Sequence, residues 1–512
     1  MSRQASDELH TLIRGLSQSE KRYVKLELRK HVLGQTNQSE LLFDAIASQK
    51  VYSEAKIKAQ HGSQPFVRRL PEAKRELLNV ILRAMRQYFA ERSATRRGIS
   101  AVQDTDFLRL RGCFHWAQQK MEDALENATL VGNHALRALT LQSHAAWERA
   151  QEIFPHPSSS PDQDPVVLEA RALLEAAYFE AVSDRMYSIV RTYGRSGGPV
   201  AEALAADLQR AGEAHLPITS AAAQSSWLRF LSIKSMFIDN NAELSLSYDV
   251  SRLEVLEQNP KARQANIHEW VNLVHSVALR LILLRRFDDA RPYRDKLYSR
   301  WQESAKGVSP ANRKAVAAQY LNIEVQLALQ SNNLEDIAPR IPQLDAVLAD
   351  HESDFLTEVG IAIHNNISLI ELGLERRAQA LRRIEHLLQY PPNFRPDVHL
   401  SSRLLRILLH LDEGNDSVVS SLIRAERRKL ADVPISPDQE ALLSFAARFF
   451  AAAPGTKRTT LLRKTLESVE SFYNASTTQP LTAMFEFRAW LRAKLNGTTW
   501  REELRKVIER GE

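Results

Sequence analysis

The sequence predicts an all-α protein, and three observations support this fold class. Only 17 of its 512 residues are Gly and 20 are Pro, which is few for a chain that turns often between β-strands. Apolar residues recur at three- and four-residue spacing, as they do along one face of an amphipathic helix. A short turn signal also returns about every forty residues. We therefore expect helices packed in antiparallel pairs.

Residues 1–97 are expected to form a separate N-terminal helical module. Ser17 and Glu20 have the S-x-x-E spacing of a capping box, in which each side chain binds the other's backbone N–H. Ser53 is expected to cap a short helix that stops at Gly62. A long helix follows from Pro71, with an inward apolar stripe. The run 92–98 interrupts this stripe, and we place the domain boundary there.

The module carries the basic excess of the chain. Residues 1–100 contain 19 Lys and Arg against 10 Asp and Glu, whereas the remainder contains 49 against 52. A basic face on a helical module is typical of contact with nucleic-acid phosphates, and a helix-turn-helix can be drawn within residues 39–70. The expected contact residues are Arg68, Arg69, Lys74 and Arg75. The alternative is the ordinary polar face of an amphipathic helix.

Residues 101–512 are expected to form an α-solenoid of antiparallel helix pairs that ends in a C-terminal capping helix. The turn signal starts at five positions separated by 46, 46, 41 and 40 residues: Asn240, Arg286, Asn332, Gly373 and Glu413. This spacing accommodates two helices and two turns per unit. Acidic residues after the turn, such as Asp288 and Asp289, suit the first turn of the second helix.

Three stretches carry resemblances to two known families. The segments 287–290 and 374–378 resemble the inter-helix turn of tetratricopeptide repeats, a likeness that extends over roughly residues 105–495. The units are longer than the usual 34 residues and lack the W-x2-L-G-x2-Y opening, so the resemblance implies a degenerate tetratricopeptide-like array. Separately, the motif LSxSEKRYxKL at 16–26 resembles the opening of an uncharacterised bacterial family of helical-repeat proteins.

Polar residues on the expected inner helices are the candidate partner-binding groove. Tetratricopeptide-type arrays bind extended peptides or helices in a concave groove, often with Asn and Arg side chains that hold the ligand backbone. The residues expected to do so are Asn272, Asn322, Asn365, Asn366 and Arg403. The alternative is that these are tolerated polar residues on helix surfaces.

The sequence carries none of the familiar catalytic motifs. P-loop, G-x-G-x-x-G, H-E-x-x-H and G-x-S-x-G patterns are absent, and a single cysteine, Cys113, excludes an intrachain disulfide. We expect no catalysis, no cofactor, no metal site, no secretory leader and no membrane span, in a cytoplasmic protein. The predicted function is a protein- or peptide-binding scaffold. The alternative is a nucleic-acid-associated regulator that uses the basic module, with the solenoid as sensor.

Overall fold

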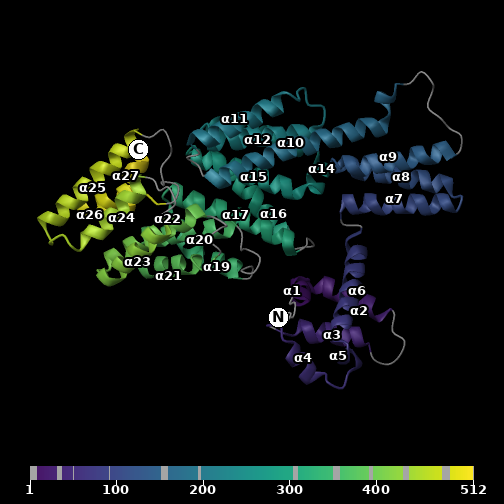
Figure 1. Ribbon diagram of the computed structural model, residues 1–512, viewed down its shortest axis with the longest axis horizontal. Helices are drawn as coiled ribbons and strands as arrows, with labels where there is room; N and C mark the ends of the chain where they lie inside the picture. The colour runs from purple at the N-terminus through teal and green to yellow at the C-terminus, as the bar shows by residue number, and fades with distance from the viewer. Residues whose placement is uncertain are drawn as a thin grey trace.

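The computed structural model confirms the all-α prediction. It describes residues 8–30, 37–49, 51–90, 93–150, 160–193, 198–303, 310–349, 358–390, 396–430, 437–475 and 485–510. Throughout these ranges every regular element is a helix, and most consecutive helices pack as neighbours (Figure 1). None of the described helices is both long enough and apolar enough to cross a lipid bilayer.

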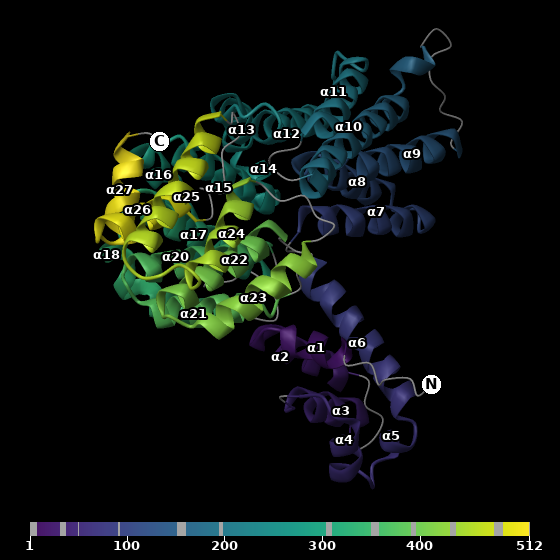
Figure 2. The same ribbon diagram turned by 60° about the vertical axis from the view of Figure 1, so that its left-hand side comes forward.

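The first module is built around one long helix. Its elements are α1 (Glu8–Gly15), α2 (Gln18–Arg29), α3 (Gln38–Ala47), α4 (Glu54–Gln60), α5 (Pro65–Arg68) and α6 (Leu70–Ala90). Ile13, Val24, Phe43 and Leu77 are buried together in its core. The predicted capping box is present, because Glu20 N–H donates to Ser17 Oγ (3.2 Å) and Ser17 N–H donates to Glu20 Oε2 (2.6 Å). Helix α6 leads from this module to the rest of the chain (Figures 1 and 2).

Helix α7 (Ala94–Leu110) includes residues 94–98 of the run at which the sequence predicts the domain boundary. Gly98 lies within this helix and is buried. A Cβ at this position would lie 2.7 Å from Leu136 Cδ2, so this glycine permits close packing of α7 against α9 and does not break the helix. The apolar pattern weakens here because small residues make the contact.

Helices α7 to α14 continue the chain as packed neighbours. Their bounds are α7 as above, α8 (Phe114–Leu130), α9 (His134–Ala150), the 3-10 turn η1 (Pro161–Gln163), α10 (Pro165–Tyr193), α11 (Gly198–Glu213), α12 (Ala221–Phe237), α13 (Ala242–Glu257) and α14 (Pro260–Ala265). Cys113 is half-buried and occupies the N-cap position of α8.

The remaining helices form successive hairpins. They are α15 (Ile267–Leu283) with α16 (Phe287–Glu303), α17 (Pro310–Gln330) with α18 (Leu334–Ile337), η3 (Ala338–Arg340) and α19 (Ile341–Ala349), α20 (Glu358–Gly373) with α21 (Arg377–Leu387), α22 (Pro396–Asp412) with α23 (Asp416–Lys429), α24 (Pro437–Phe449) with α25 (Thr456–Ala475), and α26 (Phe487–Asn496) with α27 (Trp500–Arg510). The first helices α15, α17, α20, α22 and α24 each contact the next (Figure 2).

The recurring turn signal coincides with the hairpin turns. A residue with positive φ closes the first helix at each place, namely Asn240, Arg285, Asn332, Glu375 and Gly414. In the last four turns the next residue donates its N–H to the carbonyl five residues before it, as in Arg286 N–H to Leu281 O (2.9 Å) and Arg376 N–H to Glu371 O (2.8 Å). This is the Schellman pattern, which satisfies carbonyls that a helix end leaves open.

One continuous hydrophobic core extends from Leu246 to Val507. Helices α17 and α20 are its centre, since apolar side chains on every face of them are buried, among them Leu321, Ile323 and Ile367. Burial of each such side chain contributes about 1.5–3 kcal/mol. Polar residues on these two helices are therefore surrounded by apolar neighbours.

Candidate functional site: a polar row on the inner helices

Three of the inner polar side chains share one register. His275 on α15, Asn322 on α17 and Asn365 on α20 each lie ten residues before the positive-φ residue that ends their helix. Because α15, α17 and α20 contact one another in order, equivalent positions form a row across them. We name the row of His275, Asn322, Asn365 and Asn366, with Asn272 and Gln319 one turn earlier, the amide row.

Two hydrogen bonds join α15 to α17 along the amide row. Asn322 Nδ2 lies 2.9 Å from His275 Nε2, and Gln319 Nε2 donates to Asn272 Oδ1 (3.2 Å). Burial, with a further contribution from Arg280, lowers the pKa of His275 to about 3. The imidazole is therefore neutral near pH 7, and its Nε2 accepts a hydrogen bond from the N–H of the Asn322 amide.

Three atoms of the amide row are buried without a hydrogen-bond partner. They are Gln319 Oε1, Asn322 Oδ1 and Asn366 Nδ2. Asn322 is 6% exposed and Asn366 is 3% exposed, whereas Asn272 at the other end is exposed. A buried polar atom without a partner costs about 1–3 kcal/mol. These three atoms use no hydrogen bond within the fold and are closed to solvent, so a ligand that enters at the exposed Asn272 would reach them only if neighbouring side chains move.

The other two predicted groove residues are engaged within the fold. Asn365 Oδ1 accepts a hydrogen bond from Ser402 Oγ on α22 (3.2 Å). Arg403 Nε donates to Glu426 Oε2 (2.6 Å), and the Glu426 side chain is almost fully buried. The structure thus places Asn272, Asn322, Asn365 and Asn366 along contacting helices, and commits Arg403 to an ion pair between α22 and α23.

A charged network lies beside the amide row. Arg383 on α21 donates to Asp345 Oδ2 on α19 (2.9 Å) and to Glu371 on α20, and it also lies 3.3 Å from His364 Nδ1. Burial, then the positive charge of Arg383, lowers the pKa of His364 to about 3. Burial raises the pKa of Glu371. This network connects α19, α20 and α21, and the spacing of these residues in the sequence does not predict it.

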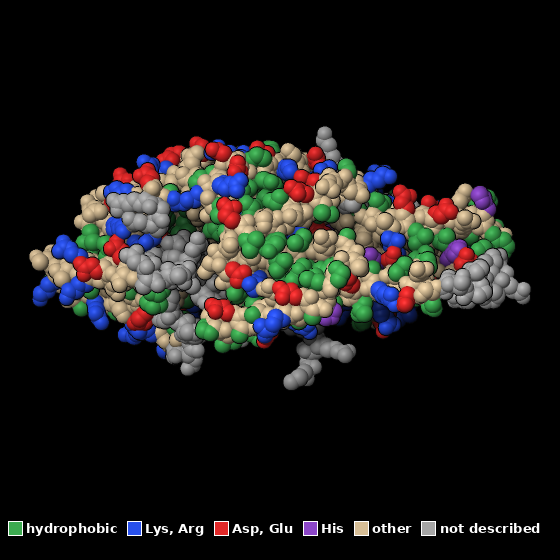
Figure 3. All heavy atoms as spheres, turned by 90° about the horizontal axis from the view of Figure 1, so that it is seen from above, with side chains coloured by type: hydrophobic (Ala, Val, Ile, Leu, Met, Phe, Trp, Pro, Cys, Tyr) green, Lys and Arg blue, Asp and Glu red, His purple; other side chains and the backbone are tan. Residues whose placement is uncertain are grey.

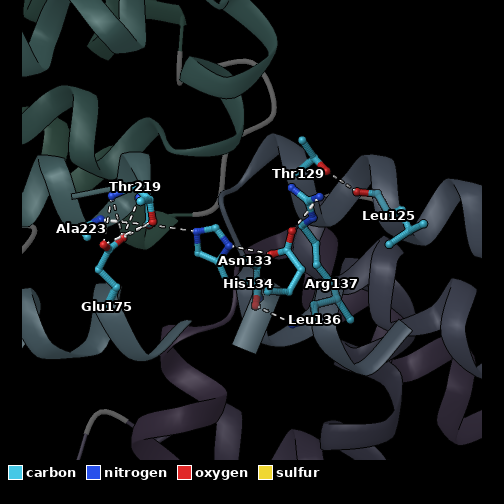
Figure 4. Close-up of polar contacts among 11 residues, drawn as sticks. Leu125, Thr129, Asn133, His134, Leu136, Arg137, Glu175, Thr219 and Ala223 are labelled. Carbon is cyan, nitrogen blue, oxygen red and sulfur yellow. Dashed lines mark hydrogen bonds and ion pairs between the residues drawn. The ribbon is translucent and has the colours of Figure 1, made fainter. Parts of the chain in front are cut away.

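A second polar cluster has the order of contacts seen in catalytic triads. His134 Nε2 lies 3.2 Å from Ser220 Oγ, and His134 Nδ1 lies 2.8 Å from Glu169 Oε2 (Figure 4). However, Ser220 is 5% exposed and its Oγ accepts the N–H of Ala223 as the N-cap of α12. Ser220 N–H is bound by Glu175 Oε2 (2.6 Å). These contacts fix the start of α12 against α9 and α10.

The predicted nucleic-acid contacts divide into exposed and paired residues. Arg68, Arg69 and Arg75 are exposed. Lys74 instead donates to Glu54 Oε1 (2.6 Å) and to Tyr52 Oη (3.2 Å). Burial lowers the pKa of Lys74, but these hydrogen bonds outweigh it and leave the pKa raised.

No group of His, Cys, Asp and Glu side chains among the described residues is arranged to hold a metal ion. No protein-family model, curated protein or solved structure matches the chain.

Proposed function

We propose that the chain is a non-catalytic scaffold that binds a protein or peptide segment along its degenerate tetratricopeptide-like array. The observation that supports it is the amide row, with Gln319 Oε1, Asn322 Oδ1 and Asn366 Nδ2 left without partners. An extended peptide backbone offers alternating N–H and C=O groups, and side-chain amides can bind both. Neutral His275 positions the Asn322 amide for this contact.

The strongest competing explanation is that the amides are only tolerated core residues. The two explanations differ in what Asn366→Leu does. Leu has the same number and branching of side-chain heavy atoms and removes the buried Nδ2 that has no partner, so the unliganded fold gains stability or stays unchanged under both explanations. Only a binding role predicts that the same substitution weakens a ligand.

The experiment is a peptide-display selection on the full-length chain, followed by calorimetry on the selected peptides. We expect Asn366→Leu to raise or preserve the melting temperature while weakening peptide affinity by about tenfold, the value of one net hydrogen bond. Asn79→Leu, at an exposed position of α6, is the matched control and is expected to leave affinity unchanged. Peptides that bind Asn366→Leu as tightly as the parent chain would exclude the amide row as the binding site.

A further inference from the structure

The segment 55–71 of the first module is basic and free of carboxylates. It contains Lys56, Lys58, Arg68 and Arg69 and no Asp or Glu. All four side chains are exposed, and within the described residues none of them forms an ion pair with a carboxylate. Glu54, just before the segment, is bound to Lys74. The four positive charges face solvent, with Lys58 also near the carboxylate of Glu54, and we name them the basic edge.

The basic edge is mounted on a fixed helix-turn-helix element. Ile57 on α4 and Phe66 on the four-residue helix α5 are buried in the module core, as is Leu70 at the start of α6. The turn is tight, since Gln64 N–H donates to His61 O (2.9 Å) and a Cβ on Gly62 would lie 3.0 Å from Lys58 O. The apolar side chains point inward, so the basic side chains on both helices remain outside.

The basic edge lies at the end of the module farthest from the array. In both views α4 and α5 are the elements most distant from α7 to α27 (Figures 1 and 2). On the face of the array seen in Figure 3, basic and acidic side chains are interspersed, with hydrophobic ones between them. A concentrated positive surface therefore stands apart from the amide row, and a large polyanion has room to reach it.

We infer that the basic edge binds the phosphate backbone of duplex DNA. In helix-turn-helix proteins one helix crosses the DNA backbone and the next lies in the major groove, and Lys and Arg near such elements contact phosphates. Non-specific binding of single strands depends instead on exposed aromatic side chains that stack on bases. The one aromatic ring of segment 55–71 apart from His61 belongs to Phe66, which is buried and packs against His61.

The inference is independent of the peptide-binding proposal, since it uses different residues on a different module. The test measures binding of the full-length chain to a short mixed-sequence DNA duplex by fluorescence anisotropy over a series of salt concentrations. We expect binding that weakens linearly on a log–log scale as salt rises. Arg68→Gln/Arg69→Gln is expected to reduce affinity by about tenfold and to lower the salt slope by about 0.9 per phosphate contact removed.

Arg463→Gln/Lys464→Gln is the matched control. These residues are also adjacent, basic and exposed, but they lie on α25. The double substitution is expected to leave the DNA affinity and the salt slope unchanged. Asn366→Leu is expected to do the same. All four Gln substitutions are at exposed positions, so both variants are expected to stay folded. An unchanged melting temperature verifies this.

Three outcomes would overturn the inference. The first is an absence of duplex binding by the parent chain at low salt. The second is an equal loss of affinity in the α25 control, which would indicate attraction by net charge alone. The third is tighter binding of a single-stranded RNA of equal length, lost in Arg68→Gln/Arg69→Gln, which would assign the surface to a different nucleic acid.

Discussion

Arg501 in the last helix pairs with Glu335, which precedes it by 166 residues. The same guanidinium donates from Nη2 to the backbone oxygen of Asn332 (3.1 Å), and Arg285 donates to the carbonyl of Ile508. Helix α27 therefore lies against the turns that close α15 and α17. We call the contacts of Arg501 with Glu335 and Asn332 the clasp.

Breaking the clasp is expected to loosen the C-terminal hairpin. A double-mutant cycle with Arg501→Ala and Glu335→Gln should give a coupling energy of about 0.2–1 kcal/mol, because solvent screens an exposed pair. The hydrogen bond from Arg501 lowers the pKa of Glu335 to about 2. The contribution is therefore complete above the ordinary carboxyl pKa of 4.5 and lost as the pH falls towards 2. Amide exchange in α27 should accelerate over that window in the parent chain and not in Glu335→Gln.

Gly373→Ala is expected to destabilise the fold although Ala favours helix. A Cβ on Gly373 would collide with Leu334 Cδ1 and would lie 3.6 Å from Trp500. The expected cost is about 1–3 kcal/mol in urea unfolding. Gly15→Ala is the matched control, because Gly15 also ends its helix and has no atom within 4 Å of the added carbon. It should instead stabilise the chain by about 0.5 kcal/mol.

Arg403 is expected to be more important for stability than an exposed arginine. Arg403→Met leaves the buried Glu426 carboxylate with Lys429 alone, at 3.6 Å, and should cost about 3–5 kcal/mol. The double variant Arg403→Met/Glu426→Leu should recover most of this loss, since no buried charge remains. Arg427→Met, which removes the exposed pair with Glu440, should cost less than about 1 kcal/mol. Equal costs for the two arginines would contradict the assigned burial.

Stability is expected to fall with pH below about 6.5 because His275 and His364 stay neutral in the fold. Burial lowers the pKa of His275 and of His364 from 6.5 to about 3. The unfolded chain binds these protons between pH 6.5 and 3 and the folded chain does not, so the free energy of unfolding decreases as the pH falls through this window. Each histidine contributes up to about 1.4 kcal/mol per pH unit. Urea unfolding at several pH values should show a shallower slope for His275→Gln; an unchanged slope would show that His275 is protonated in the fold.

The helix caps, helix ends and hairpin turns were predictable, since they depend on residues close together in the sequence. The Ser17–Glu20 capping box and the helix end near Gly62 follow from side chains a few residues apart. The turn signal at Arg286 and Asn332 likewise marks real hairpin turns. The clasp was not predictable, because nothing in the sequence near Glu335 indicates that residue 501 returns to it.

The sequence predicts the helical placement of the candidate groove residues but not their contacts. The sequence placed Asn272, Asn322, Asn365 and Asn366 on helices, and counting ten residues back from each turn would have aligned His275 with Asn322. What it could not supply is how far each helix is buried, which decides that the amide of Asn366 lacks a partner.

The clasp also constrains how this chain can evolve. Open repeat arrays commonly gain or lose a unit by duplication or deletion, since each unit contacts only its neighbours. Here the hairpins between Asn332 and Arg501 lie inside a loop that the clasp closes. Removing one of them would carry Arg501 away from the Glu335 carboxylate and Trp500 away from Gly373 at the end of α20. We therefore expect the hairpins between residues 332 and 501 to evolve by amino-acid substitution, with the number of hairpins held constant.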